Sequence, residues 1–257
     1  MDDRYLTTAA GHRIRYLTGG SGPPVLIIHP LQAAASADTW IKHFDAVGQV
    51  RTYYALDTLG WGFSDLLEDY TFDIWIEAIR EFCDGLGLQQ VDMIAWSLGS
   101  WISQLFAWRY PERVRRIAAM ASPGLNSALS GNVAAANTAL PTPERLAAQG
   151  LGPAEVERVV AMMDRPGKLE NWKRLFAYVN DLSVRDEWTL RTRLPQMQTP
   201  ILFSNWDTNS AIPPRYTIEA NNLAPNGRLE ITSGQVHDLM APSLRFLQAE
   251  TLEAGVK

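Results

Sequence analysis

Several features that define other protein classes are scarce in this chain of 257 residues. It has one cysteine, Cys83, so an intramolecular disulfide cannot form and a disulfide-stapled secreted scaffold is excluded. Unbroken apolar runs are short, as at Val25–Ile28, and fall far below the roughly 20 residues that a membrane-spanning helix needs. The acidic start Met1-Asp2-Asp3 lacks the basic-then-apolar pattern of a signal peptide. These absences predict a cytoplasmic protein without a membrane partner.

Positive charge and ligand motifs are scarce as well. Lys and Arg number 23 against 28 Asp and Glu, a net charge of −5, which argues against nucleic acid as a main partner. The acidic and His residues show no metal-ligand spacing, and Gly60 and Gly62 lack the remaining residues of a phosphate loop. We therefore expect no metal and no cofactor. The sequence leaves a monomer and a homodimer equally open.

The chain does contain a regular alternation of strand and helix patterns, with a heavy load of aromatic residues (nine Trp, eight Tyr and eight Phe). Such alternation predicts an α/β fold with a mostly parallel central sheet flanked by helices. Strand-like runs occur at Tyr5–Thr8, Arg13–Thr18, Pro24–His29, Arg51–Leu56, Val91–Trp96, Val114–Ala121, Pro200–Ser204 and Arg228–Thr232. Helical patterns occur at Ala37–Val47, Ile74–Leu86, Leu98–Tyr110, Ala211–Asn222 and Pro242–Leu252.

One segment, Ser122–Pro195, interrupts this alternation with helix signals alone. Thr142-Pro143 and Gly152-Pro153 are typical helix starts, and Leu169–Asp181 carries its apolar residues on one face. The segment is too long for a loop between two strands. We therefore predict a helical cap inserted at 122–195, with residues 1–121 and 196–257 forming the core domain.

The strongest local motif is Ala95-Trp96-Ser97-Leu98-Gly99, which lies between a predicted strand and a predicted helix. This is the setting of a nucleophile elbow, whose pattern is G-x-S-x-G. Ala95 replaces the first glycine, and because alanine is the next smallest residue the turn should still close. The helix N-terminus would present N–H groups to a developing oxyanion. The alternative is that Ser97 or Ser100 simply caps the helix.

Four further stretches, in chain order with the elbow, resemble the α/β-hydrolase family. They are His29-Pro30-Leu31, the turn from Asp57 to Asp65 (DTLGWGFSD), Tyr110-Pro111-Glu112-Arg113-Val114 and the run from Val236 to Pro242 (VHDLMAP). The resemblance extends from about Tyr5 to Phe246. It implies the α/β-hydrolase fold and a serine hydrolase with Ser97 as nucleophile. It also implies that the backbone N–H groups of Leu31 and Leu98 form the oxyanion hole.

A serine hydroxyl needs a base that takes its proton, and histidine, with an unperturbed pKa of about 6.5, is the usual one. His237 matches the family's catalytic histidine. We expect His12 and His43 to be surface or packing residues, and His29 to shape the oxyanion loop. Asp57 is expected to fix the turn that follows it.

The acid that would orient His237 is ambiguous. The family pattern places an aspartate where this chain has Asn209, and Asp207 lies two residues earlier. Asp207 through a shifted loop is the favoured interpretation, because triads are defined by geometry and not by position. Asn209 as a neutral partner and the absence of any acid are the alternatives.

Aromatic and sulfur side chains are expected between the cap and the sheet, in a substrate pocket. The candidates are His29, Trp61, Trp96, Trp172 and Phe176, together with Met162 and Met163. Such a lining implies a small, largely apolar or aromatic substrate. The elbow is similar to that of carboxylesterases, whereas the turn around Trp61 is similar to that of hydrolases of carbon–carbon bonds.

Three functions remain open from the sequence. The favoured one is a serine hydrolase that cleaves an ester, thioester, lactone or activated C–C bond through an acyl-enzyme on Ser97. The second is a lyase, cyclase or cofactor-free oxygenase of the same fold in which His237 is the base. The third is a ligand-binding pseudoenzyme, since fold does not dictate function.

Overall fold

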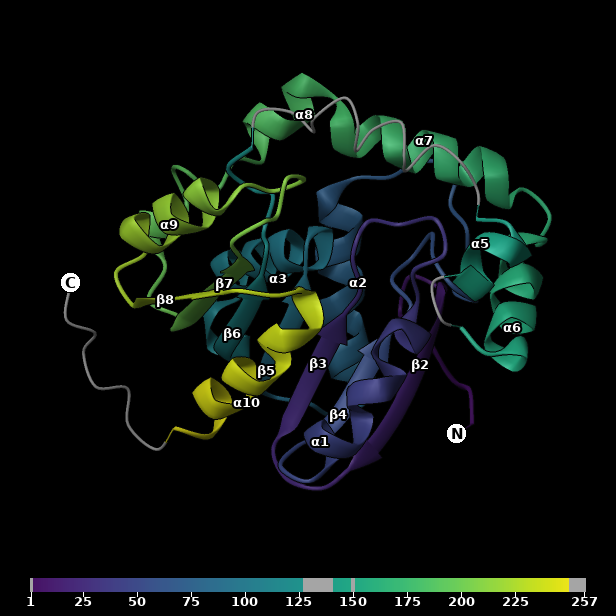
Figure 1. Ribbon diagram of the computed structural model, residues 1–257, viewed down its shortest axis with the longest axis horizontal. Coiled ribbons are helices and arrows are strands. Elements are labelled where there is room, and N and C mark those ends of the chain that lie inside the picture. Colours follow the sequence, from purple (N-terminus) through teal and green to yellow (C-terminus); the bar gives the residue numbers. More distant parts are fainter. Residues whose placement is uncertain (1, 127–140, 149–150, 250–257) are drawn as a thin grey trace.

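A computed structural model describes residues 2–126, 141–148 and 151–249, and its centre is an eight-stranded sheet (Figure 1). The strand order is β1-β2-β4-β3-β5-β6-β7-β8. The strands are β1 (Arg4–Thr7), β2 (Arg13–Gly20), β3 (Pro24–Ile28), β4 (Thr52–Leu56), β5 (Val91–Trp96), β6 (Val114–Met120), β7 (Ile201–Trp206) and β8 (Gly227–Thr232). β2 pairs antiparallel with β1 and β4, and all other pairs are parallel. The predicted α/β class and each predicted strand are confirmed within a few residues.

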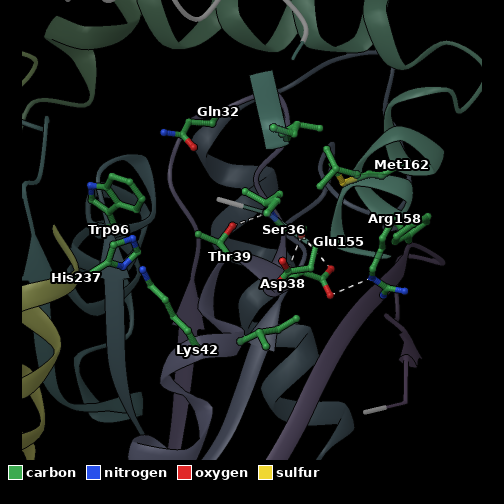
Figure 2. Close-up of a pocket in the computed structure, with 16 residues that line it drawn as sticks. Gln32, Ser36, Asp38, Thr39, Lys42, Trp96, Glu155, Arg158, Met162 and His237 are labelled. Carbon is green, nitrogen blue, oxygen red and sulfur yellow. Dashed lines mark hydrogen bonds and ion pairs between the residues drawn. The ribbon is translucent and has the colours of Figure 1, made fainter. Parts of the chain in front are cut away.

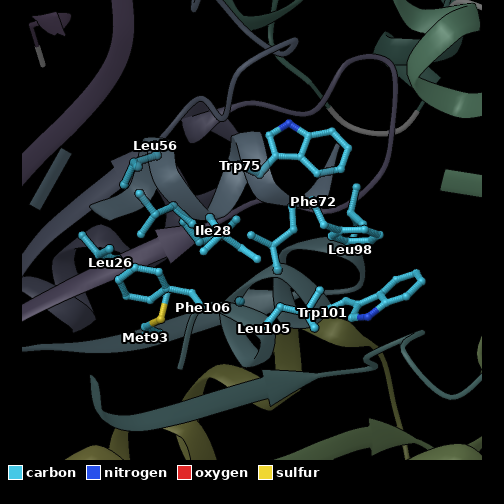
Figure 3. Packing of buried hydrophobic residues seen from close by; sticks show 14 of the residues in the cluster. Leu26, Ile28, Leu56, Phe72, Trp75, Met93, Leu98, Trp101, Leu105 and Phe106 are labelled. Atoms are coloured by element: carbon cyan, nitrogen blue, oxygen red, sulfur yellow. The ribbon is translucent and has the colours of Figure 1, made fainter. Parts of the chain in front are cut away.

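Helices cover both faces of the sheet. On one face lie α2 (Phe72–Gly85), α3 (Leu98–Arg109) and α9 (Pro214–Leu223). Figure 3 shows side chains of α2 and α3, among them Trp75 and Leu105, packed beside Ile28 of β3. On the other face lie α1 (Phe44–Gly48) and α10 (Met240–Gln248), together with the 3₁₀ helix η1 (Ala37–His43). Because helices cover both faces of the sheet, β3 is an almost continuous apolar run, and the run of β5 is interrupted by the buried Asp92, which pairs with Arg51.

Several helix boundaries differ from the prediction, and α9 begins at Pro214, three residues after the predicted Ala211. The single helix expected at Ala37–Val47 is a 3₁₀ helix followed by a short α-helix, and its start is marked by a capping box between Ser36 and Thr39. The last helix begins at Met240, directly after the 3₁₀ helix η4 (Val236–Leu239). Its predicted end at Leu252 lies outside the described residues. Two short 3₁₀ turns, η2 (Pro111–Arg113) and η3 (Leu194–Gln196), precede β6 and β7.

Four described helices fall within the predicted cap insertion, between β6 and β7. They are α5 (Pro143–Ala148), α6 (Pro153–Met163), α7 (Lys168–Asn180) and α8 (Leu182–Glu187), and they arch over one edge of the sheet and its helices (Figure 1). Aromatic rings fill the seam between these helices and the core. The ring centroid of Phe72 lies 4.6 Å from that of Trp101, 5.4 Å from Trp188 and 6.0 Å from Tyr178. Tyr178 and Trp188 therefore pack between these helices and the core.

The turn from Asp57 to Asp65 joins the cap to the sheet. The buried Asp57 carboxylate accepts hydrogen bonds from the backbone N–H groups of Ala37 (2.6 Å) and Phe63 (2.7 Å) and pairs with the buried Arg15. Burial raises the pKa of this carboxyl, and the Arg15 charge opposes that shift. From α7, Lys168 Nζ donates to the Gly60 carbonyl over 2.9 Å. Asp57 therefore fixes the turn, as expected.

Candidate active site

Ser97 lies between β5 and α3 in a backbone conformation that L-residues rarely adopt, with φ 54° and ψ −121°. Its N–H donates to the Met120 carbonyl (2.8 Å), and its carbonyl accepts from Trp101 N–H at 3.2 Å. The Ser97 side chain makes no N-cap hydrogen bond to α3. Ser100 Oγ donates to the Ala95 carbonyl over 2.6 Å and is therefore a structural group. The capping interpretation of Ser97 fails, and the strained turn is typical of an elbow that projects its serine.

Small residues make this turn possible. A Cβ atom at Gly99 would lie 2.6 Å from the His29 carbonyl oxygen and 2.8 Å from that of Ile28, both backbone atoms that cannot step aside. Ala95, by contrast, is fully buried within β5 and pairs with Ile28 without disturbing the sheet. The replacement of the first elbow glycine is thus tolerated, as predicted, whereas the second glycine is required.

Two backbone N–H groups near this turn are unpaired within the described residues. Leu98 is the first residue of α3, so its N–H has no acceptor inside the helix. The Leu31 N–H likewise donates to no acceptor in the described part of the chain. Both groups satisfy the first requirement of an oxyanion hole, a free donor, and that role stays a prediction.

His29 is a structural residue beside the predicted oxyanion loop at Pro30 and Leu31. Its buried ring donates from Nδ1 to the Pro30 carbonyl (3.0 Å), and Nε2 accepts from Thr58 N–H (3.2 Å) and lies 2.9 Å from Thr58 Oγ1. Burial lowers the pKa of His29 to about 4, so the ring is neutral at physiological pH. His29 therefore ties the predicted oxyanion loop to the 57–65 turn, and both ring nitrogens are engaged.

His237 lies in η4 and is half-buried. Its Nδ1 lies 3.1 Å from Nε2 of His43, the last residue of η1, and the two ring centroids are 5.3 Å apart. Burial, and then the nearby Lys42 ammonium, lower the pKa of His237, whereas Asp238 acts in the opposite direction. Asp238 itself accepts the Gln235 N–H (2.8 Å) and caps η4, so it is a helix-start residue.

His43, expected to be a surface or packing residue, has a contact that the sequence did not indicate. Its ring contacts the predicted catalytic base across 194 residues of sequence. Burial, followed by the charges of His237 and Lys42, lowers the pKa of His43 to about 4. The capping box at Ser36 predicts that a helix starts there. No local pattern predicts which residue contacts His43, the last residue of that helix.

The structure brings neither acid candidate to His237. The Asp207 side chain is exposed and makes no hydrogen bond to any described residue. The Asn209 amide is buried and stabilises its own loop, because its oxygen accepts from Ala211 and Ile212 N–H (both 3.1 Å) and its nitrogen donates to Asn205 Oδ1 (2.8 Å). Asp207 as the catalytic acid thus has no support from the contacts of the described chain.

A cavity of about 410 Å³ opens beside His237, between η1 and the cap helices α5 and α6 (Figure 2). Trp96 and Met162, both predicted pocket residues, line it, and Ser97 follows Trp96 directly in the chain. Charged side chains that the sequence reasoning did not anticipate line it too: Asp38, Lys42, Glu155 and Arg158. No hydrogen bond joins Ser97 Oγ to His237 within the described residues, and catalytic contacts in ligand-free enzymes often tighten only when substrate binds.

The other predicted pocket residues do not line this cavity. Trp61 and Trp172 are 0% and 2% exposed and belong to the core, where the Trp61 indole donates to the Gln32 carbonyl over 3.0 Å. Phe176 packs against Trp172, and His29 is engaged as described. Large aromatic side chains usually contribute to the core, which explains these differences from the prediction.

Comparison with known families assigns the fold. Residues 23–240 match the family of the α/β-hydrolase fold, which is most of the chain. The chain belongs to the α/β-hydrolase family. A 2-hydroxymuconate semialdehyde hydrolase from Pseudomonas sp. (strain CF600) is 33% identical over 121 residues, or 46% of this chain and 43% of that protein. The chain therefore aligns with less than half the length of this relative.

Solved α/β hydrolases superpose over almost the whole chain. A 2-hydroxy-6-oxo-6-phenylhexa-2,4-dienoate hydrolase from Rhodococcus sp. strain RHA1 has a TM-score of 0.80 at 17% identity, covering 96% of this chain and 100% of the other. An enol-lactonase from Burkholderia xenovorans LB400 has a TM-score of 0.72 at 16% identity, covering 95% and 96%. These likenesses establish the fold.

Within residues 2–126, 141–148 and 151–249, no three His, Cys, Asp or Glu side chains gather as metal ligands would. In the same residues no helix combines the length and the apolar character that crossing a bilayer requires.

Proposed function

We propose that this α/β hydrolase is a serine hydrolase that forms an acyl-enzyme on Ser97. The observation that carries the proposal is the strained left-handed backbone of Ser97 at the β5–α3 turn, followed by the free N–H of Leu98. Strain of this kind costs of order 1–3 kcal/mol and is typical of residues held for chemistry. A helix N-cap needs no such conformation.

In the proposed reaction, His237 Nε2 takes the proton of Ser97 Oγ as that oxygen attacks a carbonyl carbon. The carbonyl electron pair moves to oxygen, where the N–H groups of Leu31 and Leu98 stabilise the charge. Collapse expels the leaving group, which receives the proton from His237. Water, activated by the same histidine, then releases the acid and restores Ser97.

The substrate class is a small molecule with an ester, thioester, lactone or activated C–C bond, bound under a cap formed by residues 122–195. Relatives named as hydrolases of 2-hydroxymuconate semialdehyde and 2-hydroxy-6-oxo-2,4-heptadienoate support the C–C branch. In that branch the leaving fragment departs as a stabilised carbanion and is protonated on carbon. Trp96 and Met162 supply an apolar wall, and Lys42 suits an anionic substituent, whereas Arg158 is already paired with Asp3 and Asp38. We further propose a cytoplasmic enzyme without a cofactor.

A fluorophosphonate probe tests this function without knowledge of the substrate. We expect mass spectrometry to find the adduct on Ser97 of the folded chain. Ser97→Ala should abolish labelling and lower esterase turnover by at least about a thousandfold, since loss of a triad nucleophile typically has effects of this size. Ser183→Ala, at an exposed serine of α8, is the matched control and should label normally. Absence of labelling at Ser97 across several probes would refute the proposal.

A second function is favoured by one observation: His237 contacts no carboxylate among the described residues. In this alternative, His237 is the base of a lyase, cyclase or cofactor-free oxygenase and Ser97 forms no covalent bond. Turnover that survives Ser97→Ala but is lost in His237→Ala would support it. Loss in both variants supports the serine hydrolase.

A further inference from the structure

The group that faces Nδ1 of the proposed base is a second histidine. In a Ser-His-Asp triad this nitrogen donates its proton to a carboxylate, which holds the ring in the productive tautomer. Here His43 Nε2 lies 3.1 Å from His237 Nδ1. We propose, building on the proposed function, that His43 is the positioning residue that orients His237.

The other groups around the pair do not fill this role. From η1, Lys42 faces His237 and carries a positive charge, which cannot accept the Nδ1 proton (Figure 2). From η4, the Asp238 carboxylate accepts the Gln235 N–H. Asp238 directly follows His237 in the chain, and its side chain is therefore directed away from the Nδ1 of that ring. From the β7 end, Asp207 is exposed and the Asn209 amide is engaged in its own loop. His43 is thus the one acceptor in contact with Nδ1 among the described residues.

The proposed reaction requires a particular tautomer of each histidine ring. Nε2 of His237 must be free to take the Ser97 proton, so the ring carries its own proton on Nδ1 and donates it to His43 Nε2. His43 then carries its proton on Nδ1 and accepts with a lone pair on Nε2. Because burial keeps His43 neutral at pH 7, that lone pair is available. When His237 becomes an imidazolium, the same hydrogen bond becomes charge-assisted and stronger.

A neutral partner stabilises the imidazolium less than a carboxylate does. Loss of the carboxylate costs about 10⁴-fold in a serine-protease triad. Replacement of His43 by an apolar residue should therefore have a smaller effect, about 10- to 100-fold, because only a neutral hydrogen bond is removed. The site would then suit activated carbonyl groups, which need less help from the base.

The position of His43 is fixed from both the core and the cap. Asp38, in the same 3₁₀ helix, pairs with the buried Arg15 at 2.7 Å and with Arg158 of α6 at 3.0 Å. The capping box between Ser36 and Thr39 starts the helix, and Trp40 anchors it in the core. These contacts hold the last residue of η1 against η4.

The experiment follows the tautomer and the reactivity of His237 in the full chain. ¹⁵N NMR of the histidine rings should show neutral His237 as the Nδ1–H tautomer. His43→Leu removes the acceptor, whereas His43→Gln supplies an amide oxygen that can accept the His237 Nδ1 proton from a similar distance. We expect His43→Leu to convert His237 to the Nε2–H form and to lower the rate of fluorophosphonate labelling about 10- to 100-fold. His43→Gln should retain the tautomer and recover most of the rate.

Controls separate this proposal from a structural effect and from the proposed function. His12→Leu, in the β1–β2 turn, should change neither readout, and Asp207→Asn should leave both unchanged. An anionic partner in His43→Glu should raise the pKa of His237 and move the acid limb of the labelling profile to higher pH. If Asp207→Asn alone changes the tautomer, or His43→Leu leaves it unchanged, the proposal is overturned. If Ser97 is never labelled, the hydrolase fails, while the NMR result still decides the role of His43.

Discussion

The nucleophile side and the base side of the candidate site are built in different ways. On the nucleophile side, β5 and the first ten residues of α3 are almost wholly buried, and Ser97 lies between them. On the base side, β8 is the edge strand and leaves Leu229 and Ile231 40% and 37% exposed. His237 lies beyond this strand in a short 3₁₀ helix.

The two sides of the site owe their geometry to different interactions. The Ser97 backbone is strained, and such strain persists only where surrounding packing determines the conformation. The base side depends instead on a few polar contacts, as in the loop held by the buried Asn209 amide and the half-buried contact of His237 with His43. We therefore expect substitutions on the first side to act through packing, and those on the second to act through single hydrogen bonds and charges.

The largest effect is expected from Gly99→Ala on the nucleophile side. The new Cβ would lie 2.6 Å from the His29 carbonyl oxygen, so the β5–α3 turn must move. Overpacking typically costs about 1–3 kcal/mol, and urea unfolding should show a loss near the upper end. Gly87→Ala, where φ is +67° but nothing lies within 4 Å, is the control and should cost only about 1 kcal/mol. Equal losses in the two variants would contradict the packing argument.

A smaller effect is expected from Asn209→Asp on the base side, which restores the family's aspartate. The carboxylate still accepts the Ala211 and Ile212 N–H groups but cannot donate to Asn205 Oδ1. We expect a loss of about 1–2 kcal/mol in the free energy of unfolding. The labelling rate should stay within about threefold, because the loop keeps the side chain away from His237. A tenfold gain would show that this loop rearranges to reach the histidine.

The smallest effect is expected from Lys42→Gln. The Lys42 charge lowers the pKa of His237, so its removal raises that pKa toward the ordinary value. Because His237 acts unprotonated, labelling is present above its pKa and is lost as pH falls through it. The acid limb of the pH–rate profile should therefore move to higher pH, with the rate at pH 8 unchanged. Lys173→Gln, on the exposed face of α7, should leave the profile in place.

Local signals predicted much of the nucleophile side. The strand Val91–Trp96, which is apolar apart from Asp92, is contiguous in sequence with the small residues around Ser97 and with the helix that follows. Each of these features has a local physical meaning. The location of the aromatic residues was harder to predict. Trp61 or Trp172 is equally suited to a core or to a pocket, and only burial in the folded structure distinguishes the two. The base side was hardest, since a partner of His237 is defined by distance in space.

The sequence by itself determined the α/β-hydrolase fold, the strand–turn–helix around Ser97 and the identity of His237 as the histidine after the last strand. Periodicity and residue size, which act over a few neighbouring positions, predicted the α/β class and the turn around Ser97. The hydrolase fold and the choice of His237 came from the resemblance of short motifs to the family. Only the tertiary structure decided that His43, and neither Asp207 nor Asn209, lies against His237. The physical reason is that η1 and η4 meet through the folding of the whole sheet between them, and no local pattern encodes that contact.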